Sequence, residues 1–294
     1  MNAYSGGMSK RHTDDLHLAH LMAQAVDEVT LARFHAADLV VDTKPDLTPV
    51  TDADRRAEES IRGHLARARP RDAVFGEEFG VSGHGERTWI IDPIDGTKNF
   101  VRGVPVWATL IGLVEDGEVV VGVVSAPALN RRWWAAKDSG AFVGRSLQNA
   151  RSLHVSGVSA IEDASLSYSS LTGWHDRGWL QGMLNLQRKV WRTRGYGDFF
   201  SYTLLAEGAV DIATEPELNL YDMAALVPIV TEAGGRFTSL QGEEGPWGGN
   251  ALATNSLLHD EVLDVLRTRD AEPTPTPLPV SQDEPPRADA ARRN

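Results

Sequence analysis

Cysteine is absent from the 294 residues of the chain, and this absence removes several kinds of chemistry. Disulfide frameworks, thiolate metal sites and cysteine nucleophiles are all excluded. A catalytic metal ion would therefore have to bind to oxygen or histidine ligands.

Basic residues are few compared with acidic ones. Lysine and arginine total 29, whereas aspartate and glutamate total 41, which gives a formal net charge of −12. A protein with this charge is repelled by a phosphate backbone. We therefore expect no nucleic-acid partner.

Long apolar runs are also missing. The longest, residues 119–129, is too short to span a bilayer. The N-terminal sequence MNAYSGGMSKRHTDD has no apolar core of the kind found in a secretory signal. We therefore expect no membrane partner and a cytoplasmic location. Neither Gly-x-Ser-x-Gly nor Gly-x-x-x-x-Gly-Lys occurs, so a serine hydrolase or a P-loop enzyme is not indicated.

The two ends of the chain differ in composition from its middle. Residues 271–294 contain six of the 15 prolines and no aromatic residue, and they predict a disordered tail over 270–294. Residues 1–12 are predicted to be a flexible N-terminus. Between them we expect an N-terminal α+β domain over 13–151 and a C-terminal α/β domain over 152–269.

Hydrophobic periodicity predicts the elements of the first domain. Thr13 is a candidate cap for an opening helix. Hairpin-linked strands are expected at 89–92, 109–114, 119–126 and 132–136. Consecutive hairpins predict a largely antiparallel sheet. Trp133 and Trp134 are adjacent on one of these strands and point to opposite sides, so we expect at most one of them in the core.

The second domain alternates strands and helices, which predicts a mixed sheet. Strands are expected near 166, near 190, and at 210–213 and 252–254; helices are expected at 180–187, 201–206, 221–233 and up to 269. Pro228 should kink the helix over 221–233 or shift its boundary. The fold class is therefore α/β (α+β).

Two aspartates follow the first predicted strand of the antiparallel sheet. Asp92 and Asp95 are separated by Pro93, which cannot continue the strand. Because the chain must turn there, both carboxylates can face one point. An aspartate before a turn is more often a cap, so this motif alone is a weak signal.

The residues around these aspartates strengthen the signal. Gly96 lets the backbone approach a ligand, and Thr97 can cap a short helix whose free N–H groups suit an anion. Residues 76–78 (GEE) add two carboxylates, although a Glu-Glu pair is usually a solvated surface. Together these residues indicate a metal and phosphate site.

Four segments resemble, in the expected order, the signature blocks of the inositol-monophosphatase family. They are 76–78 (GEE), 89–100 (WIIDPIDGTKNF), 220–225 (LYDMAA) and 231–235 (TEAGG). Members of this family are magnesium-dependent, lithium-sensitive phosphomonoesterases, that is, phosphoric monoester hydrolases. The resemblance covers nearly all of 13–269 and implies a layered αβαβα sandwich and a homodimer.

Three further segments resemble the actinobacterial branch of the family that acts in histidine biosynthesis. They are 46–54, 131–134 (RRWW) and 196–199 (YGDF). This resemblance implies hydrolysis of L-histidinol phosphate to L-histidinol and phosphate. Inositol-1-phosphate, fructose-1,6-bisphosphate and 3′-phosphoadenosine phosphates are alternative substrates. A non-catalytic regulatory binding protein of the same fold is an alternative of a different class.

The resemblance also implies a set of metal ligands. Glu77, Asp92 and the backbone carbonyl of Ile94 would hold one magnesium ion, and Asp92 would bridge to a second ion held by Asp95 and Asp222. The four carboxylates contribute −4 and a phosphomonoester dianion −2, so cations are obligatory. Two Mg²⁺ ions reduce the sum to −2 and a third makes it zero, so we expect two to three ions.

The mechanism that the resemblance implies is direct hydrolysis by a metal-activated water, without a phosphoenzyme. Thr97 and Asp52 match the family residues that orient and deprotonate this water, with Glu77 in the same catalytic group. Asp52 could instead be the N-cap of a helix over 53–66, and the two roles are compatible.

The substrate is expected to contact residues from three parts of the chain. The phosphate side would use Gly96, Thr97 and Lys98 together with the metal ligands Glu77, Asp95 and Asp222. At the leaving-group side, Glu215 lies seven residues before Asp222, like the family residue that contacts the far end of the substrate. Arg194 resembles the substrate-side arginine of the family, with Arg192 as the alternative alignment.

Asp198 is the residue that bears most directly on the choice of substrate. It stands where many inositol phosphatases have a small or neutral residue, and an acid there favours a cationic alcohol. The alternative is that Asp198 is a turn residue after Gly197.

Overall fold

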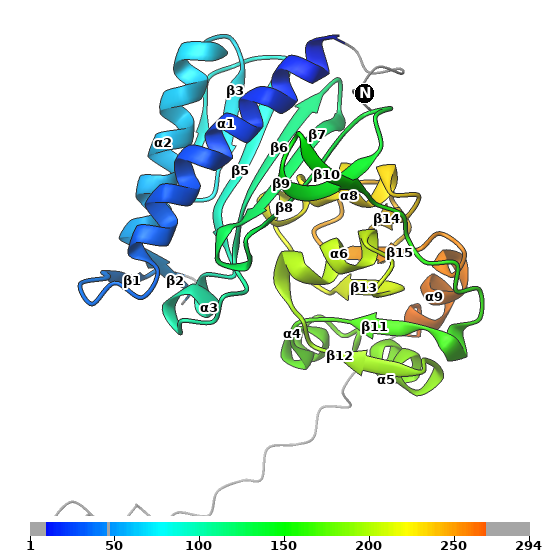
Figure 1. Cartoon of the computed structure of the whole chain (residues 1–294). Helices are drawn as coiled ribbons and strands as arrows, with labels where there is room; N and C mark the ends of the chain where they lie inside the picture. The colour runs from blue at the N-terminus through cyan, green and yellow to red at the C-terminus, as the bar shows by residue number, and fades with distance from the viewer. Residues whose placement is uncertain (1–9, 46–47, 269–294) are drawn as a thin grey trace, which may run out of the picture.

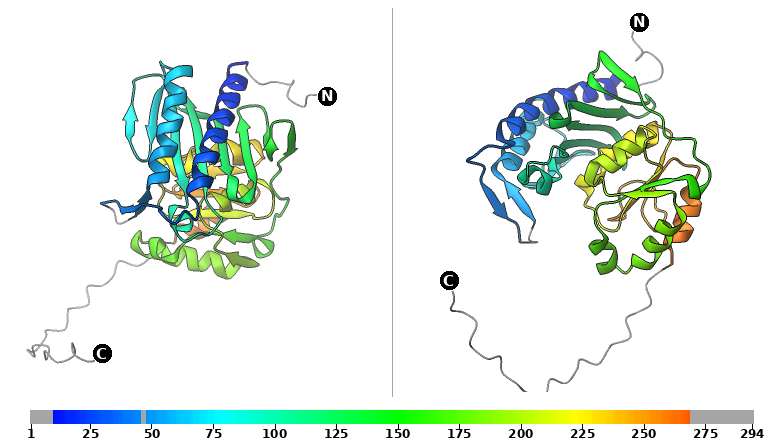
Figure 2. Two further views of the ribbon diagram at one scale, coloured as in Figure 1. Left: turned by 60° about the vertical axis from the view of Figure 1, so that its left-hand side comes forward. Right: turned by 60° about the horizontal axis from the view of Figure 1, so that its bottom comes forward.

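Five layers of helices and sheets alternate in the protein. The computed structural model describes residues 10–45 and 48–268 (Figure 1). Two large sheets are separated by a helical layer, and each has further helices on its outer face (Figure 2). The predicted αβαβα sandwich is therefore confirmed. Within the described residues, no helix has the length and apolar character needed to cross a membrane.

The first sheet has eight strands in the order β10-β9-β8-β7-β6-β5-β3-β4. Their bounds are β3 (Ala73–Gly76), β4 (Gly80–Ser82), β5 (Arg87–Asp95), β6 (Ala108–Glu115), β7 (Glu118–Ala126), β8 (Arg131–Ala136), β9 (Ala141–Ser146) and β10 (Asn149–Ser152). All neighbouring pairs are antiparallel except β3 and β5, as predicted for a largely antiparallel sheet. A separate two-stranded ribbon joins β1 (Val41–Thr43) and β2 (Pro49–Thr51).

The second sheet has five strands in the order β12-β11-β13-β15-β14 and is mixed, as predicted. Its strands are β11 (Ser165–Ser167), β12 (Arg192–Arg194), β13 (Ile212–Glu215), β14 (Arg236–Thr238) and β15 (Ala251–Thr254). β11 runs parallel to β12 and β13, whereas β15 is antiparallel to β13 and β14.

Nine α-helices of the described residues cover these sheets. They are α1 (Lys10–Arg33), α2 (Asp52–Ala68), α3 (Thr97–Val101), α4 (Leu171–Asp176), α5 (Leu180–Lys189), α6 (Asp198–Ala206), α7 (Leu220–Met223), α8 (Leu226–Glu232) and α9 (His259–Leu266). The long α1 and α2 cover the outer face of the eight-stranded sheet, and α6 and α8 lie between the sheets (Figures 1 and 2). α1 begins at Lys10, so the predicted cap at Thr13 is wrong and residues 10–12 are helical. The rest of the predicted flexible N-terminus and the predicted tail over 270–294 lie outside the described residues.

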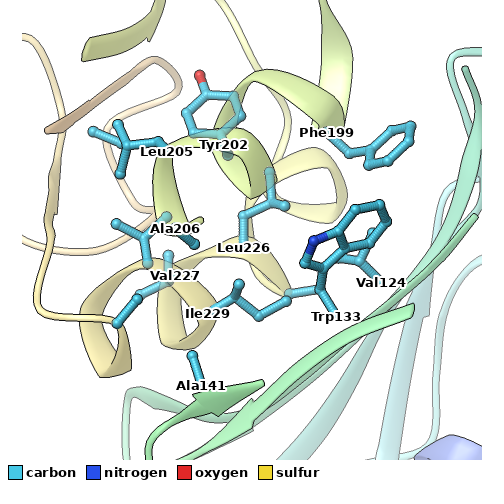
Figure 3. Close-up of a cluster of buried hydrophobic side chains, with 14 of the residues drawn as sticks. Val124, Trp133, Ala141, Phe199, Tyr202, Leu205, Ala206, Leu226, Val227 and Ile229 are labelled. Atoms are coloured by element: carbon cyan, nitrogen blue, oxygen red, sulfur yellow. The ribbon is translucent and has the colours of Figure 1, made fainter. Parts of the chain in front are cut away.

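The two halves of the chain share one core. A buried cluster joins strands β6 to β9 with α6, α8 and the five-stranded sheet. Figure 3 shows Trp133 of β8 packed beside Phe199 of α6 and Leu226 of α8. Each half supplies its own sheet, but the two halves are packed together. The predicted division into two domains near residue 151 therefore stays a prediction.

The expectation for the adjacent tryptophans is wrong, because both are fully buried. Trp133 faces the helical layer between the sheets, whereas Trp134 faces α1 and α2. Adjacent strand residues do point to opposite sides. The sheet is covered on both faces, so both sides are core.

Replacing Trp133 by alanine should destabilise the protein strongly. A large cavity would open between two layers, so we expect a loss of about 3–5 kcal/mol in the free energy of unfolding. Urea unfolding measures this loss. Trp191→Ala is the control, because Trp191 is 68% exposed. Equal losses for the two variants would contradict the packing of Trp133.

One predicted helix is in fact two. The expected helix over 221–233 is divided into α7 and α8 by a break at Ala224 and Ala225. Pro228 accounts for the break, because it has no N–H to donate to the Ala224 carbonyl and its ring crowds that position. The start of α8 also packs tightly on β7, since a Cβ atom at Gly122 would lie 2.1 Å from the Ala225 carbonyl oxygen. As a separate short helix, α7 lies against β5.

Candidate active site

An acidic cleft of about 630 Å³ lies where the end of β5 meets α3, α6 and α7. Its acidic lining residues are Glu77, Asp92, Asp95, Asp198, Glu217 and Asp222. Among the described residues, Lys98 is the only basic side chain in the lining. The residues come from segments far apart in the sequence, and the fold brings them to one place.

The end of β5 is irregular, and this irregularity directs its carboxylates into the cleft. Pairing with β6 shifts register between Asp92 and Asp95. The Ile94 N–H donates a 3.0 Å hydrogen bond to Asp92 Oδ1. Gly96 then takes a positive φ of 83° and leads into α3. A side chain at Gly96 would be strained at this φ and would lie 3.0 Å from the Val106 carbonyl oxygen.

Three of these carboxylates converge. Asp92, Asp95 and Asp222 offer oxygen atoms that all lie within 4.8 Å of one another. Asp222 is oriented at the start of α7 by a 2.7 Å hydrogen bond from the Asn219 N–H. Asp95 is oriented by a 2.7 Å hydrogen bond from the Phe199 N–H of α6. At the end of β5, α7 therefore supplies a carboxylate and α6 supplies a backbone N–H that orients Asp95.

Glu77 completes the acidic group from the segment after β3. Its side chain contacts Asp92, and its Oε1 atom accepts a 2.7 Å hydrogen bond from Lys44 Nζ. Lys44 also lies 2.7 Å from Glu78 Oε1. The segment is held by buried Glu58, which accepts hydrogen bonds from the N–H groups of Glu78 and Phe79.

Burial and mutual repulsion make these carboxylates poor anions on their own. Burial, followed by the charge of Glu77, raises the pKa of Asp92 well above its ordinary value. Burial raises the pKa of Asp222 to about 7, and burial followed by Asp198 raises that of Asp95. Such a group needs either protons or cations. Hard divalent cations prefer carboxylate and carbonyl oxygen, so the donor set fits magnesium-type chemistry.

The predicted phosphate-side residues gather at the same place. Ile94, Gly96, Thr97 and Lys98 line the cleft beside the carboxylates. The Ile94 carbonyl accepts a 3.0 Å hydrogen bond from Thr97 Oγ1. The predicted metal and phosphate residues are thus brought together.

Neither Asp52 nor its neighbour Asp54 lines the cleft. The charges of Glu77 and Glu78 nevertheless act on the pKa of Asp54. Asp52 is absent from the cleft lining and forms ion pairs of 3.1 Å with Arg33 and 3.3 Å with Arg56. Thr51, not Asp52, caps α2, in a capping box with Asp54. Asp52 is therefore not the N-cap of α2, and its expected role toward the attacking water stays a prediction.

Asp54 has two properties that suit a residue which takes a proton from water, namely burial and a raised pKa. It is fully buried, and burial, with smaller effects from Glu78 and Glu77, raises its pKa to about 7. Its Oδ2 atom accepts a 2.6 Å hydrogen bond from Thr51 Oγ1, whereas Oδ1 has no hydrogen-bond partner among the described residues. The Thr-x-x-Asp capping pattern in the sequence could have identified it.

The leaving-group predictions are met only in part. Asp198 lines the cleft, and its Oδ2 accepts a 3.2 Å hydrogen bond from Asn99 Nδ2. Glu215 is not among the lining residues, and burial raises its pKa to about 8. Neither Arg194 nor Arg192 lines the cleft. Both arginines lie on the edge strand β12. Substrate contacts of Glu215 and of either arginine therefore stay predictions.

Several cleft residues were missed by the sequence analysis. They are Thr48, Pro49, Asn99, Glu217, Leu218, Asn219 and Tyr221. Glu217 had a signal, since it is a second acid in Glu215-Pro216-Glu217, five residues before Asp222. Thr48, Pro49, Asn99 and Tyr221 lie in segments that resemble the family, but none was singled out as a site residue, and Leu218 and Asn219 lie in no such segment.

Comparisons with known proteins find relatives over most of the chain. The model of the inositol monophosphatase family matches residues 14–271. A histidinol-phosphatase of Streptomyces coelicolor is 63% identical over 262 residues, covering 88% of this chain and 98% of that protein. A histidinol-phosphatase of Mycobacterium tuberculosis is 60% identical over 254 residues, covering 86% and 98%.

A solved structure shows the same fold. An inositol monophosphatase from Zymomonas mobilis superimposes with a TM-score of 0.78 at 34% identity, covering 88% of this chain and 99% of that one. The family match spans most of the chain and includes the converging carboxylates. The chain therefore belongs to the inositol monophosphatase family.

Proposed function

We propose that the protein is a divalent-metal-dependent phosphomonoesterase that hydrolyses L-histidinol phosphate to L-histidinol and phosphate. The observation that carries this proposal is the 63% identity to a histidinol-phosphatase over 98% of that protein's length. The cleft supports it, since acidic groups remain at its leaving-group side beyond those assigned to metal. The full ligand set disfavours a non-catalytic binding protein.

The metal ligands in this proposal are those implied by the sequence. Glu77, Asp92 and the Ile94 carbonyl would hold one magnesium ion. Asp92, Asp95 and Asp222 would hold a second. A third ion would neutralise the remaining negative charge of the site and its substrate. When bound, such ions stabilise phosphoryl charge and lower the pKa of water. The raised pKa values of Asp92, Asp95 and Asp222 support this assignment.

The chain's own residues would handle the proton of the attacking water. Asp54 would take this proton at Oδ1, the buried oxygen without a partner in the described part of the chain. Its pKa of about 7 suits a general base near neutral pH. Thr97 would orient the water with its hydroxyl oxygen, and Lys98 would attract the phosphate.

The leaving group is distinguished by its charge. Histidinol carries an ammonium group and an imidazole, whereas inositol carries neutral hydroxyls. Asp198 is fixed by Asn99 and faces the cleft, where it would attract a cation. Inositol-1-phosphate lacks a partner for this charge.

A substrate panel tests the proposed function. L-histidinol phosphate, inositol-1-phosphate, fructose-1,6-bisphosphate and 3′-phosphoadenosine 5′-phosphate are each incubated with the protein, with and without Mg²⁺, and phosphate release is measured. We expect the highest kcat/KM for L-histidinol phosphate and no turnover after chelation. Comparable rates on inositol-1-phosphate would overturn the substrate assignment.

Asp54 and Asp52 can be separated by a matched pair of variants. Asp54→Asn should lower kcat by about 10²–10⁴-fold, because the base is lost while the amide oxygen can still accept from Thr51. Asp52→Asn should retain kcat within about threefold, because Asp52 lies outside the cleft lining and its carboxylate is paired with Arg33 and Arg56. The reverse order of effects would reinstate Asp52.

We further propose a homodimer in the cytoplasm, with a place in histidine biosynthesis. The dimer and the pathway rest on the similarity to the histidinol-phosphatases, and light scattering after size-exclusion chromatography tests the dimer. A monomer at micromolar concentration would contradict it.

A further inference from the structure

The rim of the cleft carries an ion pair with no role in the scheme above. Glu217 lines the cleft, and both of its carboxylate oxygens are bound by Arg177, which follows α4. The Arg177 Nε atom lies 2.9 Å from Glu217 Oε2. The two side chains are 53% and 58% exposed, so the pair sits at the mouth of the cleft.

The segment that carries Arg177 also supports the other acids of the leaving-group side. Ser169 Oγ accepts a 3.2 Å hydrogen bond from the Asp198 N–H, and Ser169 also donates to Glu215. A Cβ atom at Gly173 would lie 3.3 Å from Pro216 Cγ, so α4 packs on the residue before Glu217. Buried Trp174 anchors α4 in the core. The backbone before Arg177 is therefore packed against the segment that carries Glu217.

A bidentate pair of opposite charges presents almost no net charge to a ligand. Without Glu217, Arg177 would place a positive charge at the mouth of a cleft whose proposed leaving group is a cation. Without Arg177, Glu217 would add a negative charge. Because the pair is exposed, it contributes little to the stability of the fold. Its expected effect is on the preference of the cleft for charged or neutral substrates.

We propose that the Arg177–Glu217 pair sets the charge that the cleft presents to the leaving group, and that Glu217 is a specificity-determining residue because it neutralises Arg177. The inference rests on the proposed function for the identity of the cationic substrate. The recognised class is a phosphate ester of an amino alcohol.

The test compares kcat/KM for a cationic and a neutral ester, L-histidinol phosphate and glycerol 2-phosphate. Glu217→Gln should lower the cationic-to-neutral ratio by about threefold to tenfold, as expected for one charge acting over roughly 10 Å through a medium between water and protein. Arg177→Gln should raise the ratio by a similar factor. Arg177→Gln combined with Glu217→Gln should return the ratio to that of the unchanged protein.

Salt and a remote pair provide the controls. At 0.5 M NaCl the differences in ratio should shrink, because screening acts on charge and not on shape. Asp264 near the end of α9 and Arg267 just after it form another exposed ion pair. Asp264→Asn and Arg267→Gln each remove one charge of this remote pair and should leave the ratio unaltered. Equal changes on both esters, or a double variant no nearer to the unchanged protein than the singles, would overturn the inference.

Failure of the proposed function would be recognised separately. If the unchanged protein does not hydrolyse L-histidinol phosphate, the substrate assignment fails. The same variants are then compared on O-phosphoethanolamine and glycerol 2-phosphate. The ratio should shift in the same directions, and an unchanged ratio would overturn the role of the pair.

Discussion

Asp95→Asn should lower kcat/KM by at least about 10³-fold, since metal ions supply several kcal/mol of charge stabilisation to such reactions. Asparagine has nearly the same volume, and its oxygen can still accept the hydrogen bond from the Phe199 N–H. The core around Asp95 should therefore remain packed. Activity falls because the amide carries no charge with which to bind a divalent cation.

The same variant should behave differently without metal. Burial and the charges of Asp198 and Asp222 raise the pKa of Asp95, so this carboxylate is repelled by its neighbours in the metal-free protein. Removing the charge should leave the melting temperature of the metal-free protein equal or higher. The rise in melting temperature on adding Mg²⁺ should be reduced or lost. An active variant, or one with a normal response to Mg²⁺, would contradict the two-ion scheme.

Asp198→Asn should change which ester the protein prefers. A charge-assisted hydrogen bond to the cationic leaving group would be lost, which predicts a fall of about 10–100-fold in kcat/KM for L-histidinol phosphate. A neutral ester such as glycerol 2-phosphate should lose less than about threefold, because it makes no such bond. Steady-state kinetics on the two esters measures the difference.

Asparagine is the suitable replacement at this position. Asp198 has a φ of 49°, in the left-handed region that asparagine tolerates and alanine does not favour. The oxygen of the introduced amide could also keep the hydrogen bond from Asn99 Nδ2. If both esters lose activity equally, Asp198 has only a structural role, which is the alternative that treats it as a turn residue after Gly197.

The sequence predicted the part of the site that lies in short continuous motifs. Asp92, Ile94 and Asp95 lie at the end of β5, and Gly96 and Thr97 follow it directly, so the mutual placement of these five residues is local. Their convergence with Asp222 required the resemblance to a family, because no pattern in the sequence brings α7 to β5.

Two neighbouring aspartates are candidates for the proposed general base, and the sequence analysis considered only one of them. Asp52 and Asp54 both follow Thr51, and only the direction of the first turn of α2 separates them. The Thr-x-x-Asp capping box points Asp54 back toward Thr51 and away from solvent, whereas Asp52 turns to Arg33 and Arg56. The direction of each side chain follows from which residue is the N-cap of α2. Because the sequence analysis considered Asp52 as the N-cap, it did not identify the capping box of Thr51 and Asp54.

Long-range packing explains the remaining differences. Glu215 was placed by its spacing from Asp222, but it is buried and does not line the cleft. Arg192 and Arg194 lie on an edge strand and do not line the cleft either, which spacing cannot show. Trp133 and Trp134 are both buried because helices cover both faces of their sheet.

The most direct test is a crystal of the protein grown with Mn²⁺ and phosphate, with anomalous scattering used to locate the ions. We expect at least one manganese peak at about 2.0–2.3 Å from oxygens of Asp92, Asp95 and Asp222, with phosphate bound beside it. A cleft that holds phosphate while these carboxylates bind no ion would contradict the account.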